Sequence, residues 1–311
     1  MTAFLFCCTG YPEAAWLAAL RQHLPPEVEV RTMQAMGDPA DIAYVAAWMP
    51  PDGLLASLPN LKVIFSIASG VGHILKDPSV PAHVPLVRMS DPMQWNLMAE
   101  FAVLGVLTFH RFLPFYLDNQ KDGRWEVRWP LDTPTRPVGV LGLGGSGRAV
   151  AARLTDLGFT VHGWSRRKHE IAGITTWAGP DGLRAMLPRC AYVVCVLPLT
   201  DETRGLMDRA FFAALPDGAH LINIGRGEHI VQADLLAALD SGRLAGAFLD
   251  VFDQEPLPPD HPYWRHPKII VTPHVAGELL PRSAMKVMAD NVRRHMAGAP
   301  LPNLYDRALQ Y

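Results

Sequence analysis

Residues 137–148 read PVGVLGLGGSGR, a short apolar run that ends in a glycine-rich turn. Val138 to Leu141 predicts a buried parallel strand, and the residues from Arg148 to Leu157 predict a helix. Between them lies the pattern G-x-G-x-x-G, whose glycines allow a sharp turn, the approach of a pyrophosphate and close packing of helix on strand. The helix N-terminus also offers free N–H groups and a positive dipole end to phosphates. The stretch therefore predicts a dinucleotide-binding unit in the strand–turn–helix context that this motif needs.

Length and composition are those of an ordinary globular protein of about two domains. The chain has 311 residues, 49% of them hydrophobic, and a formal charge of −2. Its basic residues are scattered, so we expect no nucleic-acid partner, and no apolar run has membrane-spanning length, so we expect no membrane partner. Residues 1–10 lack the positive region of a signal peptide, which makes a cytoplasmic location the expectation.

The cysteines follow no metal-ligand spacing and lie in apolar, strand-like runs. We therefore interpret them as reduced core thiols and expect no metal site. The four cysteines are Cys7, Cys8, Cys190 and Cys195.

Strand-like and helix-like segments alternate along the chain, which predicts an α/β protein with two doubly wound parallel-sheet domains, Rossmann-like or flavodoxin-like, and a cleft between them. Before the glycine motif, strands are expected at 3–8, 28–31, 42–48 and 61–67, and a helix at 13–24. From the motif onward, strands are expected at 138–141, 160–164, 192–197, 219–224, 246–251 and 269–272, and helices at 232–241 and 283–297. We expect a discontinuous substrate domain at 1–98 with 279–311, and a dinucleotide-binding domain at 99–278.

A long apolar helical pattern runs from Gln94 to Leu117 and is expected to cross from one domain into the other. After it, residues 118–137 form an excursion that carries Trp125 and Trp129 and is too apolar for a simple solvated loop. Two interpretations stay open, local packing of the tryptophans or an arm that holds a homodimer together.

The end of the second strand of the dinucleotide unit indicates which cofactor is bound. In NAD-binding units an acidic residue there accepts hydrogen bonds from the adenosine ribose. Here Ser165 stands at that position and is followed by Arg166, Arg167 and Lys168. A carboxylate would repel a 2′-phosphate, whereas the planar guanidinium of arginine suits phosphate. The sequence therefore favours NADP(H), with NAD(H) as second choice, and a solvated run of charges is the alternative.

Three polar residues follow expected strand ends downstream of the glycine motif. Arg226 lies in NIGRG, Glu255 in DVFDQEPL and His274 in TPHVAG. Ligands of doubly wound sheets bind beyond the carboxyl ends of the strands, so these three side chains are expected to converge on the cofactor.

This ordered set of motifs resembles the D-isomer-specific 2-hydroxyacid dehydrogenases, in particular the branch that reduces glyoxylate and hydroxypyruvate, over nearly the whole chain. The resemblance implies NAD(P)H-dependent reduction of a small 2-oxo acid to the 2-hydroxy acid. Such chemistry needs a cation, here Arg226, to bind the carboxylate and polarise the carbonyl. It also needs an acid, here His274, to protonate the alkoxide. Glu255 would orient His274 and favour its charged form.

The same resemblance implies further binding residues. Trp48 would close the substrate pocket, with core packing as an equal alternative. The loop Ser69, Gly70, Val71 and Gly72 would hold the substrate carboxylate by its N–H groups, with a plain strand-to-helix turn as the alternative. Asp250 would bond the nicotinamide carboxamide. The other cofactor residues are Gly142, Gly144, Gly145, Ser146, Gly147, Arg148, Ser165, Arg166, Arg167, Leu197, Pro198, Thr203, Ile224, Gly225 and Gly277.

Two other functions fit parts of the pattern. A non-catalytic, dinucleotide-sensing binding module could use the same fold, although the presence of Arg226, Glu255 and His274 argues against it. An S-adenosylmethionine methyltransferase also has a glycine-rich turn after a strand, but it would want an acidic residue where Ser165 stands.

Overall fold

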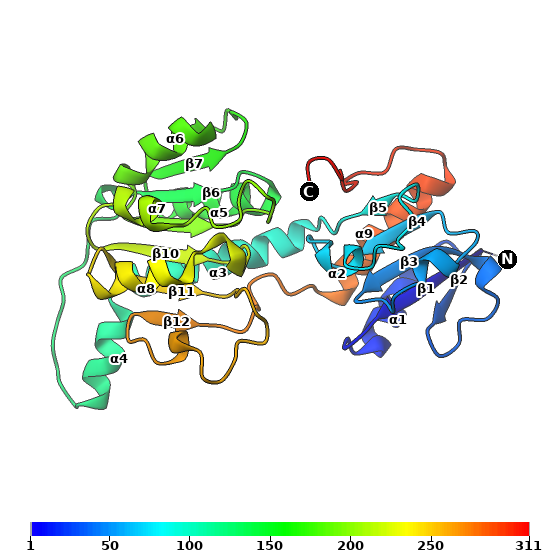
Figure 1. The fold of residues 1–311 in the computed structure, drawn as a ribbon, viewed down its shortest axis with the longest axis horizontal. Coiled ribbons are helices and arrows are strands. Elements are labelled where there is room, and N and C mark those ends of the chain that lie inside the picture. Colours follow the sequence, from blue (N-terminus) through cyan, green and yellow to red (C-terminus); the bar gives the residue numbers. More distant parts are fainter. Residues whose placement is uncertain (1, 311) are drawn as a thin grey trace. The chain divides into compact units, whose positions relative to one another are not determined.

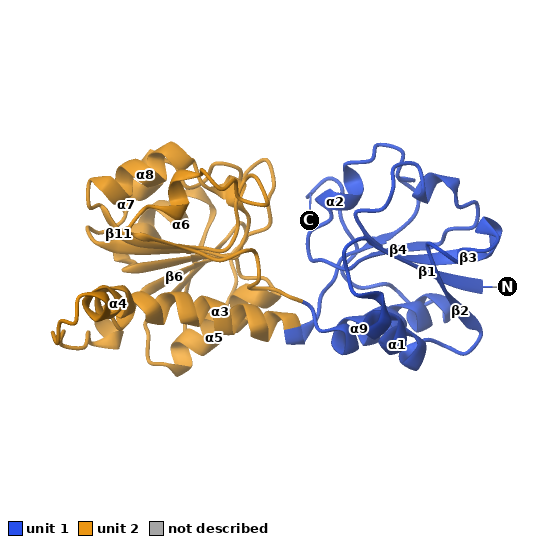
Figure 2. Cartoon of the chain, turned by 90° about the horizontal axis from the view of Figure 1, so that it is seen from below, with its two compact units in different colours: residues 1–93, 279–311 blue, residues 94–278 orange. Residues whose placement is uncertain are grey.

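The computed structural model describes residues 2–310 and divides the chain into two compact units. Unit 1 comprises residues 1–93 and 279–311, and unit 2 comprises residues 94–278 (Figure 2). The first boundary lies near the start of helix α3 (Pro92–His110), earlier than the expected change at 98/99. Chain segments from both ends of the sequence therefore build unit 1.

Unit 1 is built on a five-stranded sheet in which every strand pairing is parallel, in the order β2-β1-β3-β4-β5 (Figure 1). Helices α1 and α9 pack on one face of it, where Leu20 and Met288 join a common core with Phe4. Its strands are β1 (Thr2–Cys8), β2 (Val28–Thr32), β3 (Ile42–Trp48), β4 (Val63–Ser66) and β5 (Leu86–Val87), and its helices are α1 (Glu13–His23), α2 (Gly72–Leu75) and α9 (Pro281–Met296).

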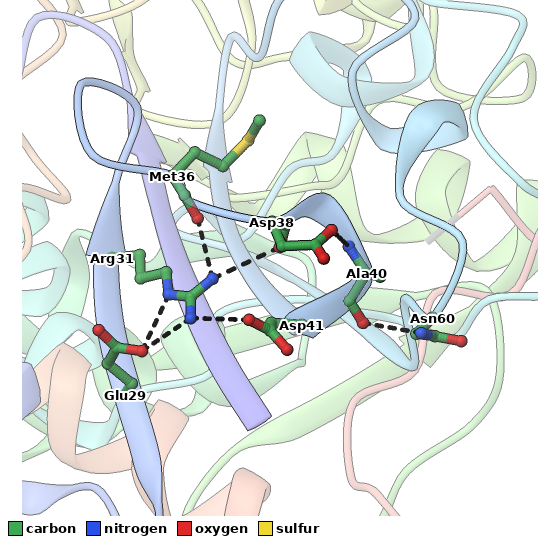
Figure 3. Close-up of polar contacts among 7 residues, drawn as sticks. All are labelled: Glu29, Arg31, Met36, Asp38, Ala40, Asp41 and Asn60. Atoms are coloured by element: carbon green, nitrogen blue, oxygen red, sulfur yellow. Dashed lines mark hydrogen bonds and ion pairs between the residues drawn. The ribbon is translucent and has the colours of Figure 1, made fainter. Parts of the chain in front are cut away.

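Edge strand β2 is tied to the rest of unit 1 by the guanidinium of Arg31 (Figure 3). Arg31 donates to Glu29 Oε2 at 2.8 and 3.0 Å, to Asp41 Oδ2 at 2.9 Å and to the carbonyl oxygen of Met36 at 3.1 Å. The side chain of Arg31 is partly buried, and the two carboxylates compensate its charge, so this cluster is a structural tie between β2 and the segment at Asp41.

Unit 2 is built on a seven-stranded parallel sheet in the order β12-β11-β10-β9-β6-β7-β8. Its strands are β6 (Val138–Leu141), β7 (Val161–Ser165), β8 (Thr175–Ala178), β9 (Tyr192–Cys195), β10 (Ala219–Asn223), β11 (Leu244–Leu249) and β12 (Ile269–Val271). Its helices are α3, α4 (Leu113–Lys121), α5 (Gly145–Asp156), α6 (Gly179–Met186), α7 (Arg209–Ala214) and α8 (Gln232–Asp240).

Helices cover both faces of this sheet, with α6, α7 and α8 on one side and α3 and α5 on the other (Figure 2). Neighbouring residues of β6 therefore enter different cores, Leu141 with Phe212 and Val140 with Leu154. A strand buried on both faces reads as a continuous apolar run, which explains why the short VGVL segment predicted a central strand. The two parallel sheets confirm the predicted fold class.

The long helix expected from residue 94 to 117 is wrong as a single element. It ends at His110, and α4 begins at Leu113 at an angle of 62° after Phe112, which has φ of +57°. Pro114 has no N–H and its ring would collide with the carbonyl four residues earlier, so it belongs in the first turn of a new helix. Across residues 2–310, no helix taken singly has the length and apolar character to cross a membrane, although α3 and α4 together pass that test.

Two strands escaped the sequence analysis because they carry no apolar run of ordinary length. β8 is a half-exposed edge strand reading TTWA, and β5 has two residues. Helix α5 begins at Gly145, earlier than the expected Arg148, so its first turn lies within the glycine motif itself.

The tryptophans of the excursion after α4 lie in solvent. Trp125 is 96% exposed and Trp129 is 86% exposed, so the interpretation that these tryptophans pack locally is wrong. The four cysteines are unpaired and buried, as predicted.

Candidate active site

The glycine-rich turn joins β6 to α5, and the fold itself requires glycine at two of its positions. Gly142 has φ of +102°, a conformation that other residues rarely adopt. A Cβ on Gly147 would lie 1.8 Å from the carbonyl oxygen of Gly142, so only glycine lets the helix come this close. Gly144 is different, because it is exposed and a Cβ built on it would meet nothing within 4 Å. The space beside Gly144 can therefore take a phosphate at the N-terminus of α5.

The start of α3 packs against this turn, a contact that the sequence analysis missed. The indole of Trp95 covers Gly145, where a Cβ would come within 2.3 Å of the ring. Ser146 Oγ donates to the Sδ atom of Met98 at 3.2 Å. Trp95 and Met98 lie in an apolar helical pattern with no polar signal, which is why periodicity alone could not single them out.

The end of β7 presents cations and no carboxylate. Ser165 is buried and its hydroxyl donates to the carbonyl oxygen of Arg167 at 2.7 Å, so Ser165 shapes the turn. Arg166 and Arg167 are exposed, and Arg166 Nη1 lies 3.7 Å from Glu202 Oε2. An exposed ion pair of this length is weak, so Arg166 can exchange Glu202 for a phosphate.

The loop after β9 is held by a threonine side chain. Thr203 Oγ1 donates to the carbonyl oxygen of Pro198 at 2.8 Å and accepts from the N–H of Thr200 at 2.8 Å. Leu197 is buried beneath this loop, whereas Pro198 is exposed. Thr203 therefore closes the loop into one turn beyond the carboxyl end of the strand.

The turn that carries Arg226 follows β10 and is fixed by a buried asparagine. Asn223 Nδ2 donates to the carbonyl oxygen of Arg226 at 2.9 Å, and its Oδ1 accepts from the N–H of Gly225 at 3.1 Å. Burial lowers the pKa of the Arg226 guanidinium, and the nearby charges of Glu255 and Glu228 oppose that shift. The backbone of Arg226 is thus held rigidly, a role of Asn223 that the motif contained but the sequence analysis did not assign.

Glu255 and His274 form a direct pair, although they follow different strands. Glu255 Oε2 lies 2.6 Å from His274 Nδ1, and Glu255 Oε1 accepts from the N–H of Phe252 at 2.9 Å. Partial burial would raise the pKa of Glu255, but the bonds from His274 and Phe252 and the charge of Arg226 bring that pKa below its ordinary value. Glu255 is therefore an ionised acceptor fixed at both oxygens.

Asp250 holds the loop that presents His274. Its fully buried carboxylate accepts from the hydroxyl of Thr272 at 2.6 Å, the N–H of Val275 at 3.0 Å and the N–H of Ala276 at 2.9 Å. His274 itself has φ of +55°, a strained conformation that persists only where the surroundings impose it. Asp250 supplies that constraint from both sides of the histidine.

The next residue of this loop, Gly277, is tied to α3. The side-chain amide of Gln94 donates to the carbonyl oxygen of Gly277 at 2.7 Å. A Cβ on Gly277 would make ordinary contacts with Met98, at 3.4 Å and beyond, so an alanine would fit here. Gln94 is a further residue that sequence reasoning did not find.

The three catalytic candidates share one edge of the sheet. Arg226, Glu255 and His274 follow β10, β11 and β12, which are neighbours in the sheet. A Cβ on Gly227 would lie 1.9 Å from the backbone of Phe252, so the Arg226 and Glu255 turns are in direct contact. Ile224 and Gly225 are buried in the turn that carries Arg226. In the glycine-rich turn, the side chain of Arg148 donates to the carbonyl oxygen of Leu143 at 3.0 Å. Among residues 2–310, no group of three or more His, Cys, Asp or Glu side chains could hold a metal ion.

The expected substrate loop belongs to unit 1, where it joins β4 to α2. Ser66 Oγ accepts from the N–H of Ala68 at 3.0 Å and lies 2.8 Å from the carbonyl oxygen of Ala68 and 3.1 Å from that of Gly70. Trp48 is half-buried, with its ring centroid 4.2 Å from that of His73 and 5.9 Å from that of Tyr11. The hydroxyl of Ser66 therefore shapes the loop. The ring of Trp48 packs against the ring of His73, which lies in helix α2 directly after this loop.

Comparison with known proteins identifies the family. The model of the D-isomer specific 2-hydroxyacid dehydrogenases, NAD binding domain, matches residues 103–276. The glyoxylate/hydroxypyruvate reductase A of Serratia proteamaculans is 40% identical over 302 residues, which are 95% of this chain and 96% of that protein. The chain belongs to the D-isomer specific 2-hydroxyacid dehydrogenase family.

Solved structures of this dehydrogenase family agree closely with the fold. A family member from Xanthobacter autotrophicus Py2, solved with NADPH and MES, superposes with a TM-score of 0.96 at 38% identity and covers 100% of this chain and 99% of its own. The NADPH-dependent glyoxylate/hydroxypyruvate reductase of Sinorhizobium meliloti, solved with NADP and sulfate, has a TM-score of 0.93 at 35% identity and covers 100% of both chains. Family membership removes the methyltransferase alternative.

Proposed function

We propose that this dehydrogenase reduces a small 2-oxo acid, glyoxylate or hydroxypyruvate, to the 2-hydroxy acid with NADPH. The observation that carries the proposal is the pair of Glu255 and His274, 2.6 Å apart and next to the turn of Arg226. A cation, an acid and an orienting carboxylate at one strand edge are the groups that carbonyl reduction requires. The reductases from Serratia proteamaculans and Sinorhizobium meliloti support the choice of substrate.

We propose that unit 2 binds the cofactor. The open space beside Gly144 fits a pyrophosphate, and the exposed guanidinium groups of Arg166 and Arg167 fit a 2′-phosphate, which favours NADP(H) over NAD(H). When bound, the cofactor supplies the hydride. The remaining residues proposed to contact it are Gly142, Gly145, Ser146, Gly147, Arg148, Ser165, Leu197, Pro198, Thr203, Ile224, Gly225, Asp250 and Gly277.

In this proposal Arg226 binds the substrate carboxylate and polarises the carbonyl oxygen. Its guanidinium is largely shielded from water, which strengthens its interaction with an anion, and its backbone is fixed by Asn223. Because the turn does not have to rearrange, stabilisation of the developing oxyanion costs little reorganisation.

His274 donates the proton to the developing alkoxide. Glu255 occupies Nδ1, which leaves Nε2 as the nitrogen that faces the substrate. Glu255, whose pKa is lowered, remains ionised at neutral pH, and a carboxylate bonded to Nδ1 orients the ring. Asp250 keeps the loop of His274 in place by accepting from Thr272, Val275 and Ala276.

Unit 1 is proposed as the substrate domain. The N–H groups of residues 69–72 would bind the substrate carboxylate, because successive backbone donors at a turn before a helix form an anion site. Trp48 would cover the substrate from the neighbouring strand β3. The ring of His73, whose centroid lies 4.2 Å from that of Trp48 at an interplanar angle of 41°, would hold Trp48 in this position.

We also propose that the protein is a cytoplasmic homodimer. The exposed Trp125, Val127 and Trp129 form an apolar arm of a kind that monomers rarely present to water. All four cysteines are reduced and buried, which suits a compartment that keeps thiols reduced.

The decisive experiment is a steady-state assay of NADPH oxidation with glyoxylate, hydroxypyruvate, pyruvate and phenylpyruvate. The proposal expects turnover with the first two at a higher kcat/KM than with the others. Equilibrium binding of NADPH without turnover on any of the four would favour the alternative, a dinucleotide-sensing module. Replacement of His274 should separate the two functions, since it removes the acid and leaves the cofactor site intact.

A further inference from the structure

His229 is a buried histidine next to the catalytic candidates to which neither the motifs nor the proposed mechanism gives a task. It ends the short turn at Gly227–His229, three residues after Arg226, and its side chain is 0% exposed. Its Nδ1 accepts from the N–H of Arg226 at 3.2 Å, and its Nε2 lies 3.2 Å from the carbonyl oxygen of Pro198. A carbonyl can only accept, so Nε2 carries the hydrogen and Nδ1 is the acceptor. One neutral tautomer satisfies both contacts.

These contacts join two different parts of the site. Arg226 follows β10, whereas Pro198 lies in the loop after β9 that Thr203 closes. The carbonyl oxygen of Pro198 thus receives hydrogen bonds from His229 and from Thr203. A continuous chain of hydrogen bonds therefore leads from the proposed nucleotide loop through one imidazole ring to the backbone of Arg226.

The ring has little freedom to move. A Cβ on Gly225 would lie 3.2 Å from its Cε1 atom, and the Sγ atom of Cys195 lies 3.5 Å from Nδ1. Burial lowers the pKa of His229 to about 4, the bond to Pro198 opposes this shift, and the charge of Arg226 adds to it. The neutral form that both hydrogen bonds need is therefore kept throughout the neutral range.

We propose that His229 is a positioning residue that couples the loop at Pro198 to Arg226, so that occupation of the nucleotide loop sets the orientation of the catalytic arginine. This inference rests on the proposed function. His229 touches neither substrate nor cofactor and acts only through the two backbones that it joins. A small misplacement of a catalytic group can lower turnover by about a hundredfold, which is the scale of effect available to such a residue.

The test compares His229→Leu, which removes both hydrogen-bonding groups, with His229→Gln, whose amide offers a donor and an acceptor. His220→Leu is the matched control, because His220 lies on β10, the strand that leads into the Arg226 turn, and its ring packs against Phe109 and Tyr192, which are not among the proposed site residues. We expect His229→Leu to lower kcat about 10- to 100-fold and to raise the Kd for NADPH. His229→Gln should recover part of both losses, and His220→Leu should change only the unfolding temperature.

A double-mutant cycle with Thr203→Val sharpens the test. If both side chains act through the carbonyl of Pro198, their effects on the Kd for NADPH will be less than additive. The proposal would be overturned if the His229→Leu variant had the same kcat and the same Kd for NADPH as the wild type. It would also be overturned if the effects of His229→Leu and Thr203→Val on that Kd were strictly additive. If His229→Leu fails to fold, His229→Gln and the cycle built on it decide in the same way. Failure of the proposed function shows separately, as absence of turnover by the wild type.

Discussion

Glu255 Oε2 and His274 Nδ1 lie 2.6 Å apart across the ends of β11 and β12, while the other oxygen of Glu255 accepts from Phe252 and Asp250 holds the loop of His274. The pair converts two half-exposed side chains into one preorganised unit. Its consequence for activity can be measured directly.

His274→Ala should lower kcat about 10²- to 10⁴-fold, the usual contribution of a general acid, with an unchanged Kd for NADPH. Glu255→Gln should lower kcat less, because the imidazole remains but loses its charged partner. Steady-state kinetics and equilibrium binding of NADPH measure both effects. A near-normal kcat for His274→Ala would remove this residue from the mechanism.

The pair of Glu255 and His274 should also affect the stability of the protein in acid. The pKa of Glu255 in the folded chain lies below its ordinary value. The ionised form of Glu255 therefore stabilises the fold at pH values above the ordinary pKa of a glutamate. This stabilisation is lost as the pH falls through the lowered pKa of Glu255 in the folded chain. Glu255→Gln should remove this part of the acid sensitivity, measured as urea midpoints at a series of pH values. The effect will be small, because the pair is half-exposed to solvent.

The glycines of the turn should separate folding from cofactor binding. Gly144→Ala adds a methyl group in open space at φ of −73°, so the free energy of unfolding should stay within about 1 kcal/mol of wild type. The methyl group should nevertheless obstruct the phosphate and raise the Kd for NADPH at least about tenfold.

Gly147→Ala is the contrasting variant. Its methyl group would meet the backbone oxygen of Gly142, which no side-chain movement can relieve, so the protein should lose stability severely or fail to fold. Thermal unfolding and NADPH titration distinguish the two. A Gly144→Ala protein that binds NADPH normally would contradict the placement of the pyrophosphate.

Cofactor preference should depend on the two arginines after β7. Replacement of Arg166 and Arg167 by serine should lower the kcat/KM for NADPH about 10- to 100-fold relative to NADH, since charge-assisted hydrogen bonds to the 2′-phosphate are lost. Glu202→Gln should act weakly in the opposite direction, because it removes one carboxylate that competes with a 2′-phosphate for Arg166. An unchanged ratio in the double variant would assign the arginines to the solvated surface.

The aromatic arm should control assembly. We expect the wild type to be a dimer by light scattering, and Trp125→Ser with Trp129→Ser to yield monomers with the same unfolding behaviour of the individual chain. The reason is that the two indoles, 96% and 86% exposed, contribute little to the core of their own chain. A monomeric wild type would refute the assembly directly.

The buried neutral His229 should make stability fall in mild acid. Its pKa in the folded chain is about 4, against an ordinary value of 6.5, so between these values only the unfolded chain binds the proton. Stability is therefore lost as pH falls from 6.5 towards 4, by about 2–4 kcal/mol in all. The charged groups that act on the ring are Arg226 and Arg204, and both disfavour its protonation. His229→Gln should flatten this slope, and an unchanged slope would contradict the burial of a neutral ring.

The sequence predicted those elements correctly whose residue pattern is local, such as an apolar run or glycines at fixed spacing. The turn at residues 142–147 and the apolar run before it predicted the strand, the turn and the helix. The helix break at Phe112 was missed, because the pattern stays mostly apolar through it and the expected helix was continued past Pro114 to Leu117. Strand β8 was missed because an edge strand has no need of an apolar run.

The amino-acid sequence by itself determined the α/β class, the family and the identity of the three polar residues behind strand ends, because these depend on residue types at short spacings and on their order. Only the tertiary structure decided that Trp95 covers Gly145, that Asp250 holds the loop of His274, and that His229 reaches Pro198 across 31 positions of the chain. Such contacts form between segments that packing alone brings together, and a hydrogen bond over that separation leaves no periodic trace in the sequence.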